Sequence, residues 1–108
     1  MDEQDRVAAF IEAHGLHAPP AYRLLDLASE VGELAKDAND STSYGIDPGS
    51  LSVGEDELGD ALFALLAFAE SMDVDAGDAL DTALAKYGRR IESSGAPGSD
   101  VERSPDGG

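Results

Sequence analysis

Apolar residues recur every three or four positions along most of the chain, the spacing of one face of an α-helix. Four helices are predicted, over residues 4–14, 20–39, 52–71 and 76–92, and no stretch alternates as a strand would. Gly15 is expected to end the first helix, Ser52 and Glu55 stand at capping-box spacing for the third, and Asp75 is the expected N-cap of the fourth. The pattern predicts an all-α protein, a four-helix antiparallel bundle.

The chain is expected to hold one domain, residues 1–92, followed by a disordered acidic tail, residues 93–108. The tail reads "SSGAPGSDVERSPDGG" and has too few apolar side chains to offset the entropy of ordering it. The remaining core is small, and the third predicted helix is apolar on every side. We therefore expect oligomerisation to complete the bundle.

Acidic residues dominate the composition. The net charge is −16, with two lysines against fourteen aspartates, which argues against nucleic acid and anionic membranes as partners. The spread of the acidic residues over the whole chain is typical of adaptation to a high-salt cytoplasm. Cysteine is absent, the N-terminus "MDEQDRVAAF" is acidic where a signal peptide is basic, and the longest apolar run has nine residues. A soluble cytoplasmic protein is expected.

Asp60 is the one ionisable residue in "LGDALFALLAFA", residues 58–69. A carboxylate in a buried helix is costly unless a basic partner, a raised pKa or a cation compensates it. Because the chain has only seven basic residues against 23 acidic ones, a bound cation is a simpler explanation than a basic partner. The alternative is that water and the dipole of the helix N-terminus stabilise Asp60.

Two pairs of carboxylates lie on consecutive predicted helices. Glu30 and Glu33 form E-x-x-E on the second helix, and by themselves they are explained by a solvated helix face. Glu57 and Asp60 form E-x-x-D on the third helix. If the two helices pack antiparallel, both pairs can face one cleft, and ligation by carboxylates alone suits Mg²⁺ or Mn²⁺.

Three basic residues cluster near the end of the fourth predicted helix, in "AKYGRRI". Lys86, Arg89 and Arg90 are there either as favourable charge at a helix C-terminus or as a cationic clamp for phosphates.

These motifs together resemble the MazG-like, all-α nucleoside triphosphate pyrophosphohydrolases. The resemblance covers roughly residues 20–92 and rests on "SEVGE", "ELGD", "VDAGDAL" and "KYGRR" in that order. It implies Mg²⁺ at the four carboxylates, with Mn²⁺ as a substitute, and phosphate contacts from the three basic residues. It also implies water attack on the α-phosphorus of a nucleoside triphosphate, yielding the monophosphate and pyrophosphate, in a homodimer or homotetramer.

Two positions depart from the family pattern. Ser29 stands where the family has an acid, and Leu84 stands where it has an asparagine. Ser29 leaves open the number of metal ions, and Leu84 leaves open how the sugar or phosphate is held. Several alternatives stay in view. These are a relative acting on phosphoribosyl-ATP or dUTP, a non-catalytic helical interaction or metal-binding module, and a plain acidic bundle. Residues that recognise a base are expected in the first helix, in residues 15–22 and in the loop 40–52.

Overall fold

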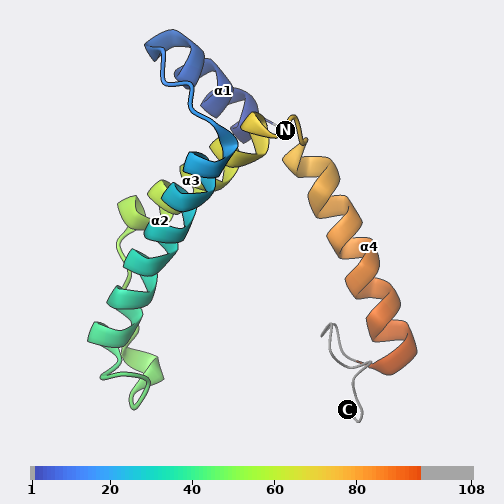
Figure 1. Cartoon of the computed structure of the whole chain (residues 1–108). Coiled ribbons are helices and arrows are strands. Elements are labelled where there is room, and N and C mark those ends of the chain that lie inside the picture. Colours follow the sequence, from blue (N-terminus) through green and yellow to red (C-terminus); the bar gives the residue numbers. More distant parts are fainter. Residues whose placement is uncertain (1, 96–108) are drawn as a thin grey trace. The chain divides into compact units, whose positions relative to one another are not determined.

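The computed structural model describes residues 2–95, which form four α-helices and a short 3₁₀ turn (Figure 1). The elements are α1 (Asp2–His14), α2 (Pro20–Ser41), the 3₁₀ turn (Pro48–Ser50), α3 (Glu55–Ser71) and α4 (Ala76–Ser94). The described residues contain no strand, so the all-α prediction is confirmed. The chain forms two compact units that divide between Val74 and Asp75, with α1, α2 and α3 in the first and α4 in the second.

Local residue chemistry sets the ends of the first two helices. Gly15 adopts a positive φ of 63°, and its N–H and that of Leu16 donate to the carbonyls of Glu12 (3.4 Å) and Ile11 (3.0 Å). This is the Schellman arrangement that glycine favours at a helix end, and it confirms the predicted stop of α1. Pro20 begins α2, where its missing N–H removes no helical hydrogen bond.

The capping box predicted at Ser52 is wrong. Gly54 is the N-cap of α3, and it has no side chain to accept a hydrogen bond. The N–H of Ser52 instead donates to Oγ of Ser41 at the end of α2 (3.0 Å). This bond ties the loop back to α2, so that the chain enters α3 three residues later than predicted.

The predicted start of α4 is confirmed, since Oδ1 of Asp75 accepts a hydrogen bond from the N–H of Asp78 at 2.9 Å. The helix runs two residues further than predicted, to Ser94, and ends at Gly95 with a φ of 80°. The rest of the predicted tail lies outside the described residues.

The core of the first unit lies around the C-terminal half of α3. There α3 packs against both α2 and α1, and its buried residues are Ala64, Leu66, Ala67 and Ala69. The small alanines let neighbouring helices approach closely. Ile11 is the buried apolar residue of α1, and Gln4 donates through Nε2 to Oε1 of Glu70 (3.1 Å) and to the carbonyl of Val74 (2.8 Å). These bonds hold the start of α1 against the end of α3.

Within one chain α3 is only partly covered, so its burial on every side stays a prediction that depends on the expected oligomer. Leu58, Leu62 and Leu65 keep 61%, 45% and 46% of their surface exposed. Both α1 and α2 pack against α3, and α3 residues from Gly59 to Ser71 line pockets that it shares with α1. Although α3 is strongly apolar, neither it nor another helix in residues 2–95 is long and apolar enough to cross a membrane.

Candidate active site

The face of α2 that packs against α3 includes charged residues. Arg23, Leu27, Glu30 and Leu34 are half-buried at steps of four, three and four residues, the repeat of one helix face. The sequence spaces Leu24, Leu27, Val31 and Leu34 as one apolar stripe, which predicts a single covered face. Only part of that stripe is covered, because Leu24 and Val31 remain 48% and 51% exposed. The covered face is therefore rotated from the predicted one, and it carries Arg23 and Glu30 toward α3.

The two carboxylates of α3 differ in exposure. Glu57 is half-buried, whereas Asp60 is exposed. Within one chain, solvent contacts the side of α3 that carries Asp60, in contrast to the burial expected from the apolar sequence around it. Water can solvate the Asp60 carboxylate here, so desolvation of this carboxylate does not by itself require a bound cation. The residues that lie near Asp60 are what favour a cation at this place.

Asp60 and Glu30 line one pocket between α2 and α3. The pocket has a volume of about 330 Å³, and we call it the carboxylate pocket. Its lining residues are Arg23, Asp26, Glu30, Asp60, Phe63 and Ala64. Three acidic residues and one arginine thus line the same space as an aromatic residue. Two of the four predicted metal ligands lie in this lining.

The other two predicted ligands occupy the next level of the same helix pair. Helices α2 and α3 lie side by side and run in opposite directions (Figure 1). Glu33 lies three residues after Glu30, and Glu57 lies three residues before Asp60, so both are displaced by about 4.5 Å toward the loop that joins the helices. Antiparallel packing therefore allows two successive pairs, although in the second pair Glu33 is exposed and only Glu57 is half-buried.

The donor set of the carboxylate pocket fits a hard divalent cation. Glu30 and Asp60 present oxygen ligands to one space, and neither sulfur nor imidazole takes part. Among residues 2–95, no three His, Cys, Asp or Glu side chains come together closely enough to hold a metal ion. The four-carboxylate metal site consequently stays a prediction, and Glu30 and Asp60 are the pair that the fold places in one pocket.

Arg23 is a site residue that the sequence analysis missed. Its Nη2 donates to the carbonyl of Leu16, and it has no carboxylate partner within ion-pair distance in the described part of the chain. The cation on α2 that does have such a partner is Lys36, whose pKa is raised by the hydrogen bond that its Nζ donates to Asp40 (3.1 Å). The signal was available, because Arg23 precedes Glu30 by seven residues, or two helical turns.

The predicted phosphate clamp lies on α4, in the second unit. Lys86 and Arg90 flank the ring of Tyr87, with Nζ 5.2 Å and Cζ 5.9 Å from its centroid. Arg89 is exposed, as is Leu84 at 57%. These contacts organise two of the three cations around one aromatic ring, and their role toward phosphate stays a prediction.

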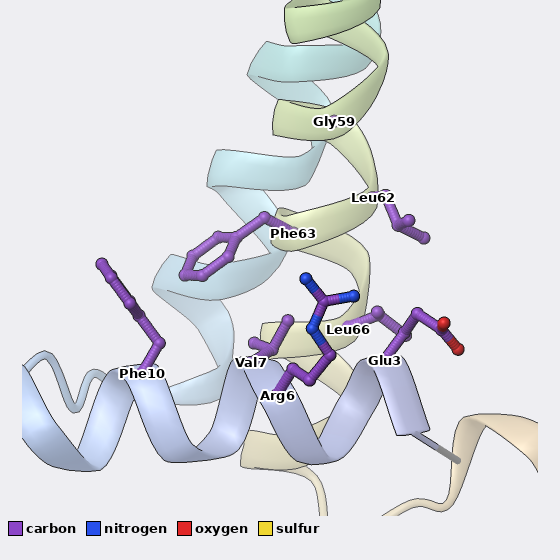
Figure 2. A pocket seen from close by; sticks show the side chains of 8 residues that line it. All are labelled: Glu3, Arg6, Val7, Phe10, Gly59, Leu62, Phe63 and Leu66. Atoms are coloured by element: carbon purple, nitrogen blue, oxygen red, sulfur yellow. The ribbon is translucent and has the colours of Figure 1, made fainter.

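A separate groove lies between α1 and α3, with a volume of about 470 Å³ (Figure 2). We call it the aromatic groove, because Phe10 and Phe63 meet there edge to face with ring centroids 6.0 Å apart. Arg6 extends across it from α1 toward α3 (Figure 2). Phe63 also lines the carboxylate pocket, so the two spaces adjoin at its ring.

Comparison with known protein families gives one match. A family model described as the MazG nucleotide pyrophosphohydrolase domain matches residues 20–94. The matched segment runs from the start of α2 to the end of α4, and it contains the four predicted metal ligands and the three basic residues of α4. No curated protein and no solved structure gives a significant match.

Proposed function

Because the chain belongs to the MazG nucleotide pyrophosphohydrolase domain family, we propose that it hydrolyses a nucleoside triphosphate to the monophosphate and pyrophosphate with Mg²⁺. The observation that carries this proposal is the carboxylate pocket, in which Glu30 and Asp60 face the same space as Arg23. Oxygen ligands and a guanidinium group are what a metal-bound triphosphate requires. Mn²⁺ would substitute, since it accepts the same ligands.

The carboxylates of the two acidic pairs have defined roles in this reaction. A divalent cation, when bound, offsets the phosphate charge and makes water more acidic. Glu30 and Asp60 hold the cation, and Glu33 and Glu57 of the adjacent pair complete its ligands. A carboxylate that is not engaged by the cation accepts the proton of the attacking water. Water attacks the α-phosphorus, and the bond to the bridging oxygen breaks as pyrophosphate leaves.

The basic residues orient the phosphates. Arg23 lies in the pocket itself, where its planar guanidinium group can donate two hydrogen bonds to phosphate oxygens. Lys86, Arg89 and Arg90 are proposed to contact the leaving pyrophosphate. A homodimer or homotetramer is proposed as well, because the half-exposed leucines of α3 form a surface that a second chain would cover.

A second candidate is a helical module that binds metal or nucleotide without turning it over. The observation that favours it is Ser29, which is exposed on α2 beside Glu30 and supplies no carboxylate to the site. If Ser29 removes an essential ligand, nucleotide would bind but pyrophosphate would not appear.

The deciding experiment is a panel of ribo- and deoxyribonucleoside triphosphates, phosphoribosyl-ATP and dUTP, assayed with Mg²⁺ at high salt for release of pyrophosphate. We expect release from at least one nucleotide, and loss of it in Asp60→Asn with an unchanged helical circular dichroism spectrum. Asp5→Asn, the same charge change at an exposed position of α1, should retain activity. Binding without release in the whole panel would favour the non-catalytic module.

A further inference from the structure

A third pocket lies between α1 and α3 and touches the start of α2. Its volume is about 530 Å³, within the range of small-molecule sites, and we call it the Arg23 pocket. Building on the proposed function, we propose that this pocket binds the nucleoside part of the substrate, with Arg23 contacting the phosphate next to the sugar.

Arg23 joins the Arg23 pocket to the carboxylate pocket, because it lines both. Its guanidinium group is anchored by the carbonyl of Leu16, a neutral acceptor, and no carboxylate of residues 2–95 lies within ion-pair distance to cancel its charge. A substrate with its phosphates at Glu30 and Asp60 would pass this cation before its nucleoside enters the second space. The order of groups in a nucleotide matches the order of these two pockets.

The lining of the Arg23 pocket suits a nucleoside. Alanines of α1, α3 and the connecting segment, among them Ala9 and Ala67, give small apolar surfaces for a base and for sugar carbons. Glu12 and Glu70 supply acceptors for hydroxyl and amino groups. Both are already fixed, since Oε1 of Glu12 lies 3.1 Å from Nε2 of His17 and Oε1 of Glu70 accepts from Gln4 at 3.1 Å.

The aromatic groove is a weaker candidate for the nucleoside. The lining residue that it shares with the carboxylate pocket is Phe63, which offers no hydrogen bond to a phosphate or a sugar. The ring of Phe63 already contacts Phe10, and this aromatic pair stands where the two spaces meet. A nucleoside that crossed there would have to pass this aromatic pair, which offers it no hydrogen bond.

The test uses a substitution that narrows the Arg23 pocket and leaves the residues of the carboxylate pocket unchanged. Ala9 is an exposed residue of α1 that lines the pocket. In Ala9→Met the larger side chain occupies part of the pocket without entering the core. Ala13→Met is the matched control, because Ala13 is exposed on the same helix and lies outside the pocket lining. Calorimetry with Mg²⁺ would compare α,β-methylene nucleoside triphosphates of the four bases with inorganic triphosphate.

We expect the unchanged protein to bind at least one nucleotide analogue more tightly than inorganic triphosphate. Ala9→Met should weaken the binding of that analogue by about tenfold or more and leave the affinity for inorganic triphosphate unchanged. Ala13→Met should change neither affinity. Equal binding of the analogue by Ala9→Met and the unchanged protein, or no binding of any analogue, overturns the proposal. Pyrophosphate release is scored separately: its absence with the expected binding pattern would overturn the proposed hydrolysis and leave the nucleoside pocket standing.

Discussion

Glu30 of α2 and Asp60 of α3 line the same pocket, opposite each other on two antiparallel helices. The pairing brings a half-buried carboxylate and an exposed one to a single space. Neither residue has a basic partner within ion-pair distance among the described residues, so their charges are left for a ligand. A divalent cation is the ligand that their oxygens suit best.

Removing one carboxylate of this pair should remove most of the activity. Glu30→Gln keeps the size of the side chain and abolishes its charge, so that a cation loses one anionic ligand. We expect kcat to fall by about 100-fold or more, since metal and electrostatic contributions of this kind are worth several kcal/mol. Initial rates of pyrophosphate release at saturating Mg²⁺ measure the fall in kcat. Glu12→Gln on α1 is not a suitable control, because Glu12 lines the Arg23 pocket. Glu92→Gln, exposed on α4, should leave kcat unchanged.

The second carboxylate pair should affect metal binding first. Glu57 lies one level from Asp60 toward the α2–α3 loop, so Glu57→Gln is expected to raise the Mg²⁺ concentration needed for half-maximal activity. A tenfold increase corresponds to about 1.4 kcal/mol of lost binding free energy. A Mg²⁺ titration of the rate checks this, and an unchanged half-maximal concentration would place the ion at Glu30 and Asp60 without Glu57.

Bound metal should stabilise the fold, because the unfolded chain does not hold the carboxylates together. Mg²⁺ at 100 times its Kd should raise the free energy of unfolding by about 2.7 kcal/mol. Thermal unfolding in MgCl₂, against NaCl at matched ionic strength, separates binding from screening of the −16 net charge. Asp60→Asn should lose the Mg²⁺-specific part. A plain acidic bundle would show equal stabilisation in both salts.

Arg23 should act on substrate binding more than on folding. Arg23→Gln removes the cation from the carboxylate pocket and is expected to raise KM by about tenfold, the worth of a hydrogen bond to a charged group. Arg23→Lys keeps the charge and loses the planar fork, so it should recover part of the affinity. Arg6→Gln is the matched control, since Arg6 lies in the aromatic groove and carries the same charge. Equal KM values for Arg23→Gln and Arg6→Gln would contradict the role.

Two glycine substitutions should have opposite effects on stability. Gly59 lies inside α3, and a Cβ added there meets no atom within 4 Å, so Gly59→Ala should stabilise the fold by about 1 kcal/mol. Gly15 has a φ of 63° at the end of α1, where an alanine is strained, so Gly15→Ala should destabilise it by about 1 kcal/mol. Urea unfolding followed by circular dichroism measures the free energy of unfolding of both variants. Changes of the same sign would contradict the different backbone conformations assigned to Gly59 and Gly15.

Local sequence signals determined the helices and several of their ends. Gly15 stops α1 because glycine accepts a positive φ, and Asp75 begins α4 because its carboxylate accepts a backbone N–H. The order of acidic pairs and basic residues also indicated the family, which the match over residues 20–94 confirms. Each helix-end signal acts within one helical turn, and the family signal is the order of short motifs along the chain, so no distant contact is needed to interpret either.

Tertiary packing decided which helix faces are covered. The apolar stripe of α2 is wide enough to allow more than one covered face, and contact with α3 selected the one that includes Leu27 and Leu34 and leaves Val31 exposed. That choice put Arg23 into the carboxylate pocket, and the packing of α1 and α2 on α3 left Asp60 in contact with solvent. Helical periodicity shows which residues share a side of one helix, but which side is buried depends on the shape and position of its neighbour.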